Sequence, residues 1–384
     1  MPEGSRRIVP LAVLLLGALL LLRGAATFFP TPWLWGADSL ADRSFLLRAV
    51  GIAAFGAVLF PAVGRGTIRS LLGLRERIPP SLLSVIGVAA GIGLLALARC
   101  RNLLLGDAQV YLSSLERGVR TAGGAHREPL AQAVTTFVYD RIARPLGGGA
   151  YEAFLLVELL LGIGFLALAI AVSRSLADRP ASRIALFAWI ALGGGLQLFA
   201  GYPEFYGYAL AGALLLAWTG LRSLRGGSLY PSAIALVFAG LSHAQIIFAV
   251  PGFLYLIVRR WTAGARTEAV VSLLAVPVLS GIALWALDYP FAEIGREMTR
   301  GGTFLPPLSE SGDRTAYSAY ALAHLAELAN VFLLLSPALP AAVALALRAP
   351  DPRRDERLLL AGLAIGPLLF ALFANPQLGM VRDW

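Results

Sequence analysis

The chain has 384 residues, of which 58% are hydrophobic and 14% charged, and its mean hydropathy is +0.72. A soluble protein of this length has too little interior to bury so much apolar sequence, so the composition predicts an all-α, polytopic integral membrane protein. The net charge of +9 comes from arginines clustered between apolar runs, which indicates membrane topology and lipid contact and excludes nucleic acid as a partner. The single cysteine, Cys100, excludes an internal disulfide.

Ten apolar runs divide the chain. They cover residues 8–22, 44–63, 80–98, 151–172, 183–200, 206–221, 231–258, 268–287, 318–347 and 358–374. Arg6 and Arg7 before the first run predict an uncleaved signal anchor, because no clear cleavage site follows. Arginine clusters belong in the cytoplasm, and those near residues 65–77, 174–183, 222–225, 259–266 and 348–357 therefore assign the loops to sides.

The run 231–258 breaks simple alternation, because it is uncharged and has arginines on both flanks. Two cytoplasmic flanks require an even number of crossings, so we expect two short helices that meet near Ser242–His243, each too short to span alone. One long, tilted helix is the alternative. With the hairpin the chain has about 11 membrane segments, a cytoplasmic N-terminus and an external C-terminus. Residues 1–78 then form a two-span N-terminal addition, and 79–384 form a membrane core with an external loop at 99–150.

The external loop contains the strongest motif. Asp107 precedes an expected helix that ends at Gly118, and on that helix Asp107 and Tyr111 share a face with Ser114. A second helix is expected at 129–142, with Pro129 in its first position, Glu128 at its positive end and an amphipathic pattern through Leu130, Val134, Phe137 and Val138. On position alone, Asp107 and Glu128 are equally well explained as helix caps in a solvated loop.

This stretch resembles the first large external loop of the multi-spanning glycosyltransferases that use a lipid-phosphate-linked sugar (GT-C type). That superfamily includes protein mannosyltransferases and aminoarabinose transferases. Asp107, Tyr111, Gly118, His126 and Pro129-Leu130 follow its order with similar spacing. The chain differs in having Ala108 where a second acid is usual, and in the inserted Arg127-Glu128.

The resemblance implies that Asp107 is the catalytic carboxylate, which takes the proton from an acceptor hydroxyl. Glu128 would orient the acceptor or help to hold a divalent cation; no other cofactor is expected. The leaving lipid phosphate needs cationic donors, for which His126, Arg127 and Arg382 are the external candidates, with Asp383 beside the last. Each of these cations is otherwise explained as a snorkelling or topology residue.

Three further segments carry candidate residues. Glu204 lies in a tight turn between two runs, where a carboxylate is costly unless it faces an aqueous site, and we expect it either to contact the sugar or to support the residues that do. The tyrosines around it, Tyr202, Tyr206 and Tyr208, are expected as an interfacial belt. His243 is the one ionisable group of its apolar run, and a ligand or phosphate contact there competes with a structural role.

His324 lies on a polar stripe with Glu327 and Asn330, which faces either a cavity or a neighbouring helix. The acidic segment 288–317 is either a lid or a solvated loop. The three histidines are too scattered in sequence to indicate a metal site. The end of the chain directly after a run, at Trp384, suggests that an outer domain is missing.

Three functions remain open. The first is an inverting glycosyltransferase of the bacterial inner membrane, with its active face periplasmic. Its partners would be a polyprenyl-phosphate sugar, membrane lipid and an acceptor that is a glycan, a lipid or a protein. The second is a lipid or polysaccharide transporter or flippase of the cell envelope, and the third is a non-catalytic scaffold. An enzyme requires its acids to converge at the outer side, whereas a transporter places them along a path through the membrane.

Overall fold

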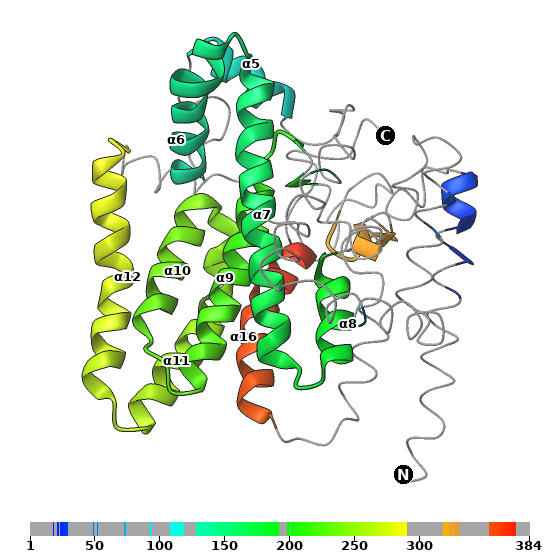
Figure 1. Ribbon diagram of the computed structural model, residues 1–384. Helices are drawn as coiled ribbons and strands as arrows, with labels where there is room; N and C mark the ends of the chain where they lie inside the picture. Colours follow the sequence, from blue (N-terminus) through cyan, green and yellow to red (C-terminus); the bar gives the residue numbers. More distant parts are fainter. Residues whose placement is uncertain are drawn as a thin grey trace.

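The computed structural model describes residues 108–118, 128–191, 201–289 and 353–373, together with residues 198–199 and short pieces between 18 and 93 and between 318 and 329. Every regular element in this part of the chain is helical (Figure 1). The all-α expectation is therefore confirmed for the described residues. The runs 8–22, 44–63 and 80–98 lie almost wholly outside them.

Two short helices, α5 (Ala108–Glu116) and α6 (Pro129–Val138), come from the loop that precedes the first long helix. Gly118, with a φ of 67°, follows α5, and Pro129 opens α6 behind the N-cap residue Glu128, both as expected. The chain stays helical after α6 through a π turn (Tyr139–Ala143) and a 3₁₀ turn (Arg144–Leu146). The segment expected at 129–142 is thus helical throughout, with altered hydrogen bonding after Val138.

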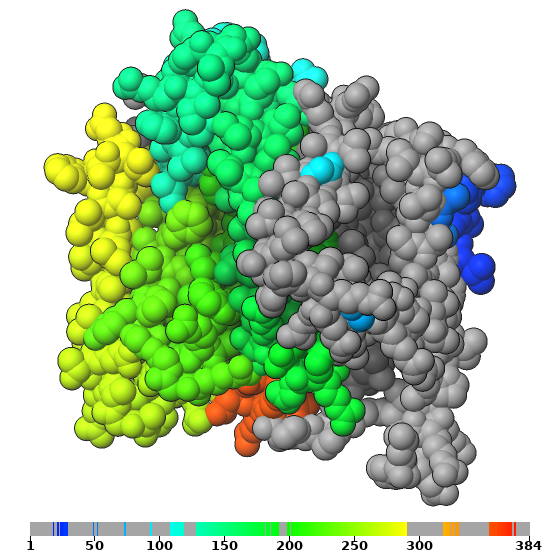
Figure 2. All heavy atoms as spheres, viewed as in Figure 1, coloured from blue at the N-terminus to red at the C-terminus, as the bar shows by residue number. Residues whose placement is uncertain are grey.

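Three of the described helical segments are long and apolar enough to cross a membrane. They are α7 (Ala150–Leu176), α12 (Arg266–Ala286) and Ala244–Thr262, which joins a 3₁₀ turn (Ala244–Ala249) to α11 (Val250–Thr262). α12 forms one outer face of the molecule (Figure 2), and Leu274, Val278 and Trp285 are exposed along it. Such a face suits contact with lipid.

Four further helices complete the described bundle. α8 (Pro180–Ala191), α9 (Tyr206–Leu224), α10 (Tyr230–Ser242) and α16 (Arg354–Phe373) pack on α7 and α11. α9 lies between α7 and α10, and α16 runs beside α11 (Figure 1). The main apolar core lies between α9, α10 and α11 and includes Leu216, Leu236 and Phe253.

The run 231–258 forms two helices, as predicted. α10 ends at Ser242, and His243 is extended, with φ −158° and ψ 118°. Glu268 accepts hydrogen bonds from the Ser228 hydroxyl and the Leu229 amide just before α10, and lies 3.6 Å from Arg260 near the end of α11. Both arms therefore return to the same end of the bundle. Both helices were expected to be too short to cross the membrane alone. This expectation holds for α10 but is wrong for the second arm, because the 3₁₀ turn extends that arm to 19 residues.

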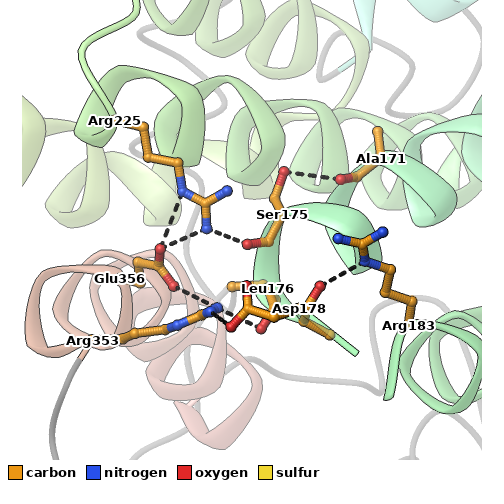
Figure 3. A network of polar contacts seen from close by, with 9 residues as sticks. Ala171, Ser175, Leu176, Asp178, Arg183, Arg225, Arg353 and Glu356 are labelled. Carbon is orange, nitrogen blue, oxygen red and sulfur yellow. Dashed lines mark hydrogen bonds and ion pairs between the residues drawn. The ribbon is translucent and has the colours of Figure 1, made fainter. Parts of the chain in front are cut away.

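Arginines gather at this end, which we call the basic end and define by Arg183, Arg225, Arg260 and Arg353. Arg225 hydrogen-bonds Glu356 at 2.7 Å and also donates to the Ser175 carbonyl. Arg353 donates to the Leu176 carbonyl at 2.6 Å and to Asp178 at 2.5 Å (Figure 3). These cations occupy the negative end of α7, where free carbonyls need donors.

A second set of contacts at the basic end ties α11 to its neighbours. Asp355 accepts hydrogen bonds from Arg259 at 2.5 Å and from the Tyr255 hydroxyl at 2.7 Å, and Arg260 donates to the Ser223 carbonyl at 3.1 Å. The arginine clusters at 174–183, 222–225, 259–266 and 353–357 thus share one end of the bundle, as their assignment to one side requires.

Candidate functional site

Acidic and aromatic side chains meet at the opposite end of the bundle, which we call the site end and define by Glu128, Glu204 and His243. α6 packs against α10 there. Ala131, Thr135 and Val138 face inward, and Glu128 at the start of the helix is only 6% exposed. Buried carboxylates are rare unless they are paired, so its neighbours decide what Glu128 does.

His243 is the imidazole neighbour of Glu128. Its Nε2 lies 3.9 Å from Glu128 Oε1, which is too long for a direct hydrogen bond and suits a bridging group. Its Nδ1 accepts the Gln245 amide at 3.3 Å, so the neutral ring carries its proton on Nε2, facing Glu128. The ring also packs against Tyr206, with centroids 4.9 Å apart and the planes tilted by 35°. The break between the two arms of the hairpin therefore presents an oriented proton donor to a buried carboxylate.

The turn at residues 201–205 brings Glu204 and Tyr111 to the same end. Gly201 has a φ of 78° and packs on Leu155 of α7, which fixes the turn against the start of that helix. The Phe205 ring lies 4.7 Å from the ring of Tyr111 and 5.6 Å from that of Phe154, so α5, α7 and the turn form one aromatic cluster. Glu204, next to Phe205, is buried.

The tyrosines of this turn do not form the expected interfacial belt. Tyr202 and Tyr208 are buried, and Tyr206 is half-buried on His243. Packing against α6 and α7 explains the difference, since Tyr208 belongs to an apolar cluster with Phe154 and Ala131. Tyr208 interacts with Glu158, and Tyr206 packs on His243.

Glu158 was missed by the sequence reasoning. It lies on α7, about 12 Å from the start of that helix at 1.5 Å per residue. It is 0% exposed, close enough to Glu204 for an electrostatic interaction, and packed against Gly207 of α9. The available signal was a carboxylate in the interior of the apolar run 151–172, well beyond Glu152 at its start, which is itself a reason to expect function.

The outward face of α6 is apolar. Val134, Phe137, Ile142 and Leu146 are exposed on α6 and the turns that follow it. Leu130, by contrast, packs beside Leu241 and Leu284, which ties the start of α6 to α10 and α12. A short helix with one apolar side and a polar start is typical of a segment that lies along a membrane surface.

Five predicted site residues, Asp107, His126, Arg127, Arg382 and Asp383, lie outside the described residues. Glu128, Tyr111, Glu204 and His243 lie at the site end, where Glu128 meets His243 and Tyr111 meets Phe205, the residue after Glu204. His324 is buried, and its Nε2 hydrogen-bonds the Leu372 carbonyl at 2.8 Å. Of the two alternatives, a cavity or a neighbouring helix, His324 therefore faces the neighbouring helix. Among the described residues, no group of three or more His, Cys, Asp or Glu side chains is arranged to hold a metal ion.

Comparison of the chain with protein-family models, with curated proteins and with solved structures finds no match in any of the three. The arrangement at the site end must therefore be interpreted from its own chemistry. Buried carboxylates beside a proton-bearing imidazole and several phenols can orient hydroxyl groups and exchange protons with them.

Proposed function

We propose that the chain is a membrane glycosyltransferase that transfers a sugar from a polyprenyl-phosphate donor to an acceptor at the outer face of the bacterial inner membrane. One observation carries the proposal. The loop segment that resembles such enzymes folds back onto the end of the bundle and meets, through Glu128 and Tyr111, the acidic turn at Glu204 and the hairpin break at His243. Convergence at one end is what an enzyme requires.

The position of this end relative to the membrane supports the same function. Arginines are retained on the cytoplasmic side, so the basic end is assigned to the cytoplasm and the site end to the outside. The exposed apolar side of α6, with Val134 and Phe137, would lie at the outer membrane boundary. A polyprenyl chain would then remain in lipid while its phosphate reaches the level of Glu128.

The proposed chemistry is a single displacement. An acceptor oxygen attacks the anomeric carbon on the face opposite the phosphate, and its proton passes to Asp107. The bond from the anomeric carbon to the phosphate oxygen breaks, and its electron pair leaves with the phosphate. Glu128 and His243 orient the acceptor hydroxyl, while His126, Arg127 and Arg382 stabilise the charge that develops on the leaving phosphate.

Reconstitution tests the proposal directly. The full chain in proteoliposomes is offered a panel of polyprenyl-phosphate hexoses, labelled in the sugar, with an envelope glycan, a lipid or an unfolded protein as acceptor. We expect label in one acceptor class. Glu128→Gln should lower the rate about 10²-fold through lost orientation, whereas the exposed residue of α5 changed in Glu116→Gln should leave it unchanged. Equal rates in both variants would contradict the role of Glu128.

A second candidate is a lipid or polysaccharide transporter of the cell envelope. It is favoured by Glu158, a carboxylate well inside a helix that is long enough to cross the membrane. The same proteoliposomes distinguish the two functions. Movement of labelled lipid between leaflets, without transfer of its sugar to any acceptor, would establish transport and overturn the transferase.

A further inference from the structure

Glu158 has no role in the proposed transfer, yet its surroundings are specific. It is fully buried, and within the described part of the chain neither of its carboxylate oxygens has a hydrogen-bond partner. A Cβ atom on Gly207 would collide with Oε2, so the carboxylate lies directly against the first turn of α9. An ionisable group in such a place is costly unless something compensates its charge.

The neighbours of Glu158 supply oxygen atoms. Glu204 is buried beside it and interacts with it electrostatically. The Tyr208 hydroxyl is buried without a hydrogen bond of ordinary geometry, although its interactions with Thr135 and Glu158 place both beside it. The Thr135 hydroxyl donates to the Ala131 carbonyl at 2.8 Å, which leaves its lone pairs available. All four side chains are buried, so oxygen atoms gather in this part of the bundle.

Among the described residues, no ion pair compensates an ionised Glu158. The ion pairs of Arg225, Arg259, Arg260 and Arg353 lie at the basic end, and none of them includes Glu158. The start of α9 contributes roughly half a positive charge as a helix N-terminus. An ionised Glu158 carries one full negative charge, so the helix end alone does not neutralise it. One added positive charge would bring the site close to balance.

We propose that Glu158 and Glu204 hold one small monovalent cation, Na⁺ or a proton, with the hydroxyls of Tyr208 and Thr135 as further oxygen ligands. A divalent ion fits less well, because Ca²⁺ takes six to eight oxygen ligands and Mg²⁺ strict octahedral geometry. Phe154 and Phe205 belong to one apolar cluster with Tyr208, so its hydroxyl lies in largely apolar surroundings. The site does not depend on the transferase reaction, and it would serve a transporter equally well.

Thermal unfolding of the full chain in detergent micelles tests the site. Wild type is measured in NaCl, KCl and choline chloride at equal ionic strength and pH 7.5. We expect Na⁺ to raise the midpoint in a saturable way, on the order of 2 °C at ten times its dissociation constant. Glu158→Gln and Glu204→Gln should abolish the rise. Glu152→Gln is the matched control on α7, because Glu152 only caps the helix through the Gly149 amide.

A pH series in choline chloride distinguishes a proton from Na⁺. If the occupant is a proton, Na⁺ has no effect, and the midpoint rises on acidification from pH 8 to 5 in wild type and in Glu152→Gln. Glu158→Gln should flatten that rise, while the contributions of Glu128, His243 and Glu204 remain. Equal responses of wild type and Glu158→Gln in both series would overturn the proposal.

Tyr208→Phe keeps the proposal testable if Glu158→Gln does not fold. It preserves the ring packing on Phe205 and removes one oxygen ligand. We expect the Na⁺ concentration at half-maximal effect to rise at least threefold, or the acid-induced rise to become smaller if a proton is bound. If Tyr208→Phe responds to Na⁺ and to acid as wild type does, the assignment of Tyr208 as a ligand is contradicted.

Discussion

Gly207→Ala tests how closely Glu158 packs on α9. The added Cβ would overlap Glu158 Oε2, and the nearby carboxylate carbon would lie only 3.0 Å away. Overpacking of this kind costs about 1–3 kcal/mol. Alanine recovers up to about 1 kcal/mol of helix propensity relative to glycine, so a net loss of about 0–2 kcal/mol in the free energy of unfolding is expected.

Gly164→Ala is the matched control. Gly164 lies on α7, and a Cβ built on it meets nothing within 4 Å. Reversible unfolding in mixed detergent micelles, followed by circular dichroism, should show this variant to be as stable as wild type or more stable. A double-mutant cycle then isolates the contact, because in a Glu158→Ala background Gly207→Ala has no carboxylate to meet.

The expected coupling in this cycle is about 1–3 kcal/mol, the cost of the overlap itself. Its sign is specific, since the second alanine should be tolerated better when the first is present. If Gly207→Ala behaves like Gly164→Ala, or if the two changes are simply additive, Glu158 does not lie against the first turn of α9.

The remaining predictions concern the basic end and its orientation. Arg353→Ala should cost about 1–3 kcal/mol of unfolding free energy, because it removes a charged donor from the α7 carbonyls. Asp178→Ala should cost at most about 1 kcal/mol, because that side chain is 85% exposed, and equal losses would contradict this account of the ion pair. In a Cys100→Ser background, an impermeant thiol reagent added outside intact cells should label Leu146→Cys but not Ala263→Cys. The reverse pattern would invert the assigned sides.

Much of the helical arrangement follows from local rules that act on short stretches. Pro129 opens α6 because its missing N–H costs nothing in the first turn. The hairpin was predicted from arginines on both flanks of one uncharged run, and the chain indeed reverses after Ser242. The length of the second arm was not predictable in this way. No change in hydropathy separates its 3₁₀ turn from the helix that follows, so the sequence does not show that the two form one long segment.

The assembly of the site depended on contacts between distant parts of the chain. Glu204 and His243 were expected as candidates one by one, because each is an ionisable group in apolar surroundings. Nothing in their spacing indicated that His243 would meet Glu128, since that contact depends on how α6 packs against α10. Glu158 was overlooked because one acid barely changes the mean hydropathy of a long run.

The prediction that the tyrosines form an interfacial belt was wrong for a related reason. Aromatic residues between two membrane runs usually lie at the interface, and that rule was applied to Tyr202 and Tyr208 without a tertiary partner in view. Side chains of α5, α6 and α7 pack around Tyr208 and bury it, and Tyr202 is buried as well. The amphipathic pattern of the loop that forms α5 and α6 was recognised in the sequence. The surface against which these helices pack was not predicted.

The rate of sugar transfer by Asp107→Asn is the most direct test of the proposed function. The substitution keeps the shape of the side chain and removes its ability to accept the acceptor's proton. Transfer from a labelled polyprenyl-phosphate sugar should fall by roughly 10²–10⁴-fold relative to wild type and to Glu116→Gln, while binding of the donor lipid is retained. Full transfer activity in Asp107→Asn would contradict the mechanism.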